Sequence, residues 1–121
     1  MEPQDNGAPD PQTTVDELRE MVRQFVAERD WSQFHSPKNL SMSLAIEAAE
    51  LMEHFQWLTI EQSREIDEPQ KQEAGEEIAD VLCYTLALAN ELGLDLSQTL
   101  RAKMRKNAVK YPAETFRGRS H

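Results

Sequence analysis

Residues 77–89, EIADVLCYTLALA, form the stretch that decides the fold. Its last nine residues are apolar nearly all round, and a helix of that kind is buried. Pro69 before the stretch and Gly93 after it are typical of the first turn and the C-terminal end of a helix. The sequence therefore predicts a long, buried helix over residues 69–92.

Three more helices are expected around this one, and no segment predicts a strand. Thr14 and Glu17 form a capping box ahead of an apolar stripe with helical spacing. Pro37 is interpreted as a breaker in the loop that follows. The first two have expected ranges of 14–30 and 41–58, with a short helical turn near 60–66. The third is expected to begin at a cap on Asp95 or Ser97 and to end before Pro112. The predicted fold is all-α and resembles a four-helix bundle.

The composition narrows the class of protein. A chain of 121 residues suits one domain, and 13 basic against 22 acidic residues, a net charge of −9, argue against a nucleic acid polymer as partner. Cys83 is the single cysteine, so neither an intrachain disulfide nor a cysteine zinc site is expected. The N-terminus is polar and no apolar run can span a bilayer. We expect a soluble, cytoplasmic protein with no membrane partner.

Three regions are predicted along the chain. Residues 1–13 hold three Pro and one Gly and are expected to be a disordered tail. Residues 14–112 form the folded domain, and residues 113–121 a flexible C-terminal tail. Residues 97–121 carry seven basic residues and one acidic residue, so a basic segment follows an acidic body.

Two of the predicted helices carry paired carboxylates. Glu47, Glu50 and Glu53 lie along one side of helix 41–58. Glu77 and Asp80, three residues apart, share a face of helix 69–92. A carboxylate stripe is usually a solvated face, but here large apolar residues flank it. That flanking favours a polar slot in a packed surface.

Carboxylates that converge in a partly dry site repel one another and stay ionised only beside a cation. Oxygen ligands select Mg²⁺, Mn²⁺ or Ca²⁺. Zinc is not expected, since the sequence has three His and no HExxH motif. The Glu-x-x-His pairs of di-iron bundles are also absent.

The C-terminal helix and one loop supply candidate contacts to a ligand. Lys103, Lys106, Asn107 and Lys110 share a face that either is simply solvated or grips phosphates. Trp31 lies in a polar loop and is a candidate stacking surface for a base, although most Trp residues pack in cores.

Together these residues resemble the MazG-like all-α nucleoside triphosphate pyrophosphohydrolases. The signature of that family is Glu-x-x-Glu followed by Glu-x-x-Asp, matched here at 47–50 and 77–80. The resemblance is greatest to the dCTP pyrophosphatase branch, through the stretches at 28–40, 47–57 and 103–112. Val22 departs from the branch, which can place a His at that position.

The resemblance implies a set of site residues and a cofactor. The metal ligands would be Glu47, Glu50, Glu77 and Asp80, holding Mg²⁺ with Mn²⁺ as a possible substitute. The nucleoside pocket would be formed by Trp31, His35, Asn39, Trp57 and Tyr84. The residues that contact phosphates or close the site would be Lys103, Asn107 and Tyr111. The family also implies a homo-oligomer, a tetramer built as a dimer of dimers, with sites shared between chains.

The reaction implied is hydrolysis between the α and β phosphates of dCTP or a modified dCTP, giving a monophosphate and pyrophosphate. No residue set suggests a covalent nucleophile, so water should attack directly. Glu53 is the candidate to orient or deprotonate it, and a second metal ligand or a solvated carboxylate is an equal alternative for this residue. The alternatives are a dUTP or broad nucleotide specificity on the same fold, or a non-catalytic helical interaction module. A Ca²⁺-binding regulator is disfavoured because no EF-hand loop is present.

Overall fold

The computed structural model describes residues 7–119, and every regular element in that part of the chain is helical. The absence of strands there confirms the predicted all-α class. The longer helices are α1 (Val15–Glu28), α2 (Pro37–Glu53), α4 (Glu68–Leu92) and α5 (Leu96–Lys110). The shorter elements are η1 (Asp10–Gln12), η2 (Ser32–Phe34), α3 (Ile60–Arg64) and α6 (Ala113–Phe116).

Side-chain caps set where most of the helices begin. The hydroxyl of Thr14 accepts a hydrogen bond from the Glu17 amide, which confirms the predicted start of α1. Asp95 rather than Ser97 caps α5, by accepting from the Gln98 amide at 2.8 Å. Gly93 adopts a left-handed φ of 65° and ends α4 as predicted.

The predicted range of the second helix, 41–58, was wrong at both ends. Ser36 caps α2 by accepting from the Asn39 amide, and Pro37 occupies the first turn instead of breaking the helix. Proline is tolerated there because its missing N–H would have no partner within the helix. The helix ends at Glu53 instead of residue 58. Residues 54–58 form turns and a bend that lead to the Thr59 capping box of α3.

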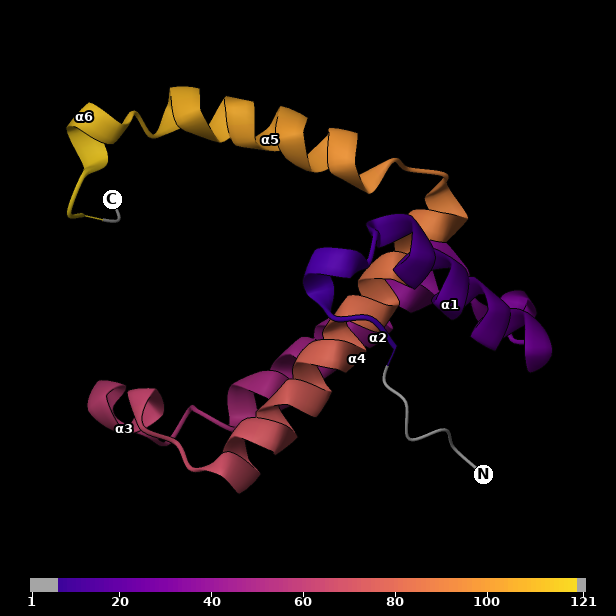
Figure 1. The fold of residues 1–121 in the computed structure, drawn as a ribbon, viewed down its shortest axis with the longest axis horizontal. Coiled ribbons are helices and arrows are strands. Elements are labelled where there is room, and N and C mark those ends of the chain that lie inside the picture. The colour runs from indigo at the N-terminus through magenta and orange to yellow at the C-terminus, as the bar shows by residue number, and fades with distance from the viewer. Residues whose placement is uncertain (1–6, 120–121) are drawn as a thin grey trace.

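The core lies where α1 and α2 pack against α4. Figure 1 shows α2 running alongside α4, with α1 crossing near the C-terminal half of α4. The buried cluster takes one residue each from α1 and α2 and two from α4, namely Val22, Leu40, Leu86 and Ala87. The 77–89 stretch is therefore central, as predicted, although only some of its faces are covered within this chain.

Helix α5 differs from the expected bundle. It extends away from the other long helices (Figure 1), while Leu96 in its first turn packs against the core. Leu100, Met104 and Val109 along it are 62%, 55% and 81% exposed. The chain exposes 10035 Å², whereas a compact monomer of 13.9 kDa should expose about 6,700 Å².

The structure describes only part of each predicted tail, 1–13 and 113–121. Residues 1–6 and 120–121 lie outside the described residues. Within 7–13 the chain forms the single turn η1, and within 113–119 it forms α6. The Phe116 ring of α6 meets the Tyr111 ring edge-on, with 5.3 Å between centroids. Among residues 7–119, no helix has the length and apolar character needed to cross a membrane.

Candidate functional site

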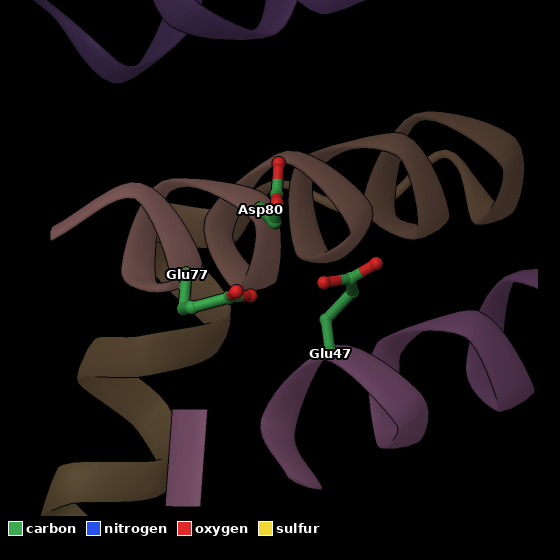
Figure 2. Close-up of side chains that lie close together, drawn as sticks. All are labelled: Glu47, Glu77 and Asp80. Atoms are coloured by element: carbon green, nitrogen blue, oxygen red, sulfur yellow. The ribbon is translucent and has the colours of Figure 1, made fainter. Parts of the chain in front are cut away.

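Three carboxylates from two helices meet between α2 and α4. One oxygen of each of Glu47, Glu77 and Asp80 lies within 4.8 Å of the other two. Figure 2 shows Glu47 on α2 and Glu77 on α4 with their carboxylates turned toward each other, and Asp80 beside them on α4. Glu47 and Glu77 are half-buried and Asp80 is exposed. The packing of α2 on α4 thus brings together three of the four predicted metal ligands.

The fourth predicted ligand, Glu50, lies one turn after Glu47 and is also half-buried. The pKa of Glu47 is raised from 4.5 to about 7. Desolvation by burial is the largest cause, followed by a side-chain hydrogen bond with Glu50 and the negative charges of Glu50, Asp80 and Glu77. Glu50 therefore belongs to the same electrostatic cluster, although it is not one of the three oxygens in closest approach.

The acidic cluster fits a divalent cation with a preference for oxygen ligands. In residues 7–119, the Oε2 atoms of Glu47 and Glu77 are buried and have no hydrogen-bond partner. A buried acceptor without a partner costs free energy, and a like charge nearby adds to that cost. A cation such as Mg²⁺ or Mn²⁺ bound by these oxygens would remove both costs.

His54 is a neighbour of the cluster to which the sequence analysis gave no role. Its Nε2 atom lies 3.8 Å from Oε1 of Glu77, and both side chains are half-buried. The signal was present in the sequence, because His54 shares a helical face with Glu47 and Glu50. The imidazole thus lies beside the Glu77 carboxylate, just past the end of α2.

A cavity of about 190 Å³ opens beside the acidic cluster. Trp31, His35 and Tyr84, three predicted nucleoside-pocket residues, line it together with Asp80. The rest of the lining is mainly apolar and comes from α1 and α4. An aromatic and apolar cavity next to a group of carboxylates can hold a flat ring while its charged end meets a cation.

The loop before α2 places His35 and Trp31. The Asn39 side-chain amide donates a hydrogen bond to the Phe34 carbonyl at 3.1 Å, and the Asn39 backbone amide donates to Ser36. Asn39, predicted to help form the pocket, thus holds the backbone of the loop that carries His35.

Five other predicted site residues belong neither to the acidic cluster nor to the lining of the cavity within this chain. Trp57 follows α2 and is 86% exposed, and Glu53 is the exposed last residue of α2. Lys103, Asn107 and Tyr111 lie on or just after α5, the helix that extends away from the core (Figure 1). Within one chain, Lys103, Asn107 and Tyr111 therefore lie on an arm, α5 and its C-cap, that stands away from the core.

Comparison with known proteins identifies the family of this chain. The sequence model of the MazG-like family matches residues 42–121, which include the predicted metal ligands on α2 and α4. The chain belongs to the MazG-like family. It is also similar to the crystal structure of a pyrophosphatase from Archaeoglobus fulgidus DSM 4304, with a TM-score of 0.77 and 40% identity. That match covers 87% of this chain and 98% of the archaeal one.

Curated relatives of this MazG-like chain include dCTP pyrophosphatase 1 from mammals. The Mus musculus protein is 41% identical over 110 residues, which are 89% of this chain and 65% of the mouse protein. The Homo sapiens protein is 41% identical over 112 residues, which are 91% of this chain and 66% of the human protein. The MazG-like chain thus spans just under two thirds of the length of these relatives.

Proposed function

We propose that this chain is a Mg²⁺-dependent nucleoside triphosphate pyrophosphohydrolase that converts dCTP, or a modified dCTP, to the monophosphate and pyrophosphate. The observation that carries this proposal is the convergence of Glu47, Glu77 and Asp80 beside a cavity lined by Trp31 and Tyr84. Glu47 and Glu77 each bury an oxygen that accepts no hydrogen bond from residues 7–119. The similarity to dCTP pyrophosphatase 1 and to an archaeal pyrophosphatase supports the same reaction class.

In this proposal the four carboxylates of Glu47, Glu50, Glu77 and Asp80 hold the cation. When bound, Mg²⁺ or Mn²⁺ supplies electrophilic polarisation of the phosphoryl group and lowers the pKa of a bound water. Water attacks the α phosphorus, the bond to the bridging oxygen breaks, and pyrophosphate leaves. Glu53, one turn beyond Glu50, is the proposed group that orients or deprotonates the water.

The nucleoside is proposed to enter the cavity beside Asp80. Trp31 and Tyr84 offer aromatic surfaces on which a base can stack. His35 lines the same cavity and can hydrogen-bond a base edge, while the buried Val22 makes part of the wall aliphatic. Because an aliphatic wall cannot hydrogen-bond a base, we expect the choice among nucleobases to depend strongly on His35.

The active form is proposed to be a homo-oligomer, a tetramer arranged as a dimer of dimers, in which α5 of one copy reaches the site of another. The extended α5, its exposed Leu100 and Met104, and the excess of accessible surface support this arrangement. Lys103, Asn107 and Tyr111 would then approach the phosphates at a neighbouring acidic cluster and offset the charge of the leaving pyrophosphate. Trp57 would close the nucleoside pocket.

The direct test is pyrophosphate release with and without Mg²⁺. The panel comprises dCTP, 5-methyl-dCTP, dUTP, dTTP, dATP, dGTP and the ribonucleotides. We expect Mg²⁺-dependent formation of dCMP and pyrophosphate from dCTP, and the panel ranks the remaining substrates. Orthophosphate as the direct product would contradict the proposed bond cleavage. No turnover of any nucleotide would instead favour a binding module that keeps the fold.

A further inference from the structure

The C-terminal end of α1 leads directly into Trp31. The Trp31 amide donates to the Val26 carbonyl and the Asp30 amide donates to the Ala27 carbonyl, both at 3.1 Å. These two bonds are the Schellman pattern of helix ends, in which the first residue past the helix is left-handed. Asp30 has a φ of 52° and is the one residue other than glycine in 7–119 with a positive φ.

The end of α4 shows the same cap built with glycine. The Leu94 amide donates to Ala89 at 3.0 Å and the Gly93 amide donates to Asn90 at 3.3 Å, with Gly93 at a φ of 65°. Aspartate tolerates this region better than most residues, although less well than glycine. At α1 the Gln33 side-chain amide donates to the Asp30 carbonyl at 3.1 Å and to its carboxylate at 3.4 Å. These bonds hold Asp30 in its conformation.

An aromatic contact completes this cap. The rings of Phe25 and Trp31 meet edge to face, with 5.7 Å between centroids and an interplanar angle of 74°. The Arg29 guanidinium lies 3.7 Å from the centroid of the Phe25 ring and donates to the Phe25 carbonyl. Phe25 and Trp31 both line the cavity beside Asp80. The ring of Phe25 is thus fixed by Arg29 and in turn restrains the indole.

We propose that Asp30 and Phe25 are positioning residues that hold the Trp31 indole at the cavity in the orientation in which it receives the nucleobase. This inference rests on the proposed function, because it takes the cavity to be the nucleoside pocket. A surface fixed before binding loses less conformational entropy when the ligand arrives. Loss of the cap should therefore weaken nucleotide binding without altering the acidic cluster on α2 and α4.

The test compares Asp30→Val and Phe25→Leu with the control Asp30→Gly, in protein labelled with 5-fluorotryptophan. A β-branched residue opposes the left-handed conformation and glycine accepts it. The Trp31 fluorine signal is assigned with Trp31→Phe, and the Trp57 signal serves as an internal reference. We expect the Trp31 signal to shift or broaden in Asp30→Val and Phe25→Leu and to stay unchanged in Asp30→Gly.

The kinetic readout separates positioning from a general loss of structure. Base stacking on an aromatic side chain accounts for about tenfold or more in binding, so we expect KM for dCTP to rise about tenfold in both variants. We expect kcat to stay within about twofold of wild type, because the acidic cluster is untouched. Asp30→Gly should retain the wild-type KM.

Two results would overturn the inference. One is an unchanged Trp31 signal in a folded Phe25→Leu protein, which remains informative even if Asp30→Val does not fold. The other is a displaced Trp31 signal with wild-type KM. If wild type hydrolyses no nucleotide, the proposed function fails, whereas the fluorine signals still decide whether Asp30 and Phe25 position the indole.

Discussion

The carboxylates of Glu47 and Glu77 face each other between α2 and α4, and each buries an Oε2 atom that accepts no hydrogen bond from residues 7–119. Two helices that belong to the core therefore hold like charges together. Packing of apolar neighbours fixes this arrangement, so the repulsion persists until a proton or a cation relieves it.

Added Mg²⁺ should stabilise the protein against thermal unfolding, and more at pH 8 than at pH 5.5. Below its pKa of about 7 Glu47 is largely protonated, and the metal must then displace a proton. At 100 times the dissociation constant, a bound ion adds about 2.7 kcal/mol. Melting curves with and without Mg²⁺ at both pH values provide the measurement. An identical shift at the two pH values would contradict the role of Glu47 as a ligand.

Without metal, stability should fall as the pH rises from 4.5 through 7. The folded pKa of Glu47 is raised above its ordinary value, so its contribution is fully present below pH 4.5 and is lost as the pH passes about 7. Glu47→Gln is neutral throughout and should show a flatter profile. Urea unfolding at a series of pH values, with EDTA present, compares the two proteins. Parallel profiles would argue against the raised pKa.

Glu50→Gln and Asp80→Asn should each lower turnover by more than about 100-fold. Loss of a hydrogen-bond partner of a metal ligand already lowers metal affinity or activity by about 10- to 100-fold, and these two variants change the ligands themselves. The metal-free variants should melt no lower than wild type, since the substitution relieves repulsion. Glu76→Gln, an exposed neighbour of Glu77 on α4, is the matched control and should stay active. A clear loss of apo stability in Asp80→Asn would instead indicate a structural role.

A shared site predicts complementation between two inactive variants. Lys103→Ala removes a residue of α5 and Asp80→Asn removes a ligand of α4, so a mixed pair of chains can form one intact site. Random pairing across a two-fold interface makes about half of the pairs mixed, and a mixed pair has one intact site out of two. After joint refolding we therefore expect about a quarter of wild-type activity. Mixing Lys103→Ala with Tyr111→Phe is the control, because both changes fall on the same arm. Activity no higher than that of the separate variants would contradict sharing.

Leu40→Ala should destabilise the domain by about 2–5 kcal/mol. Leu40 is 1% exposed and lies in the first turn of α2, where it packs into the core with residues of α1 and α4. Chemical unfolding in EDTA measures the change. Met42→Ala, two residues further along α2 and 48% exposed, is the control and should cost much less. Equal losses in the two variants would contradict the assigned core.

Local sequence signals predicted much of the fold and part of the site. The caps at Thr14 and Gly93 were correct, and Asp95 was one of two candidate caps for α5, because each cap depends on hydrogen bonds within one turn. The start of α2 was missed because Pro37 occurs both in loops and in first helical turns, and the Ser36 cap decides between them. The approach of His54 to Glu77 was missed because the two residues come from different parts of the chain.

The sequence by itself determined that the chain is helical, that the 77–89 stretch lies at its centre, and which carboxylates share a helical face. These properties follow from the helical repeat and from short-range hydrogen bonds. Only the tertiary structure decided that Glu47 meets Glu77 and Asp80, that Trp31 and Tyr84 line one cavity, and that α5 stands apart. Contacts between helices depend on how their surfaces pack, and no local pattern fixes that packing.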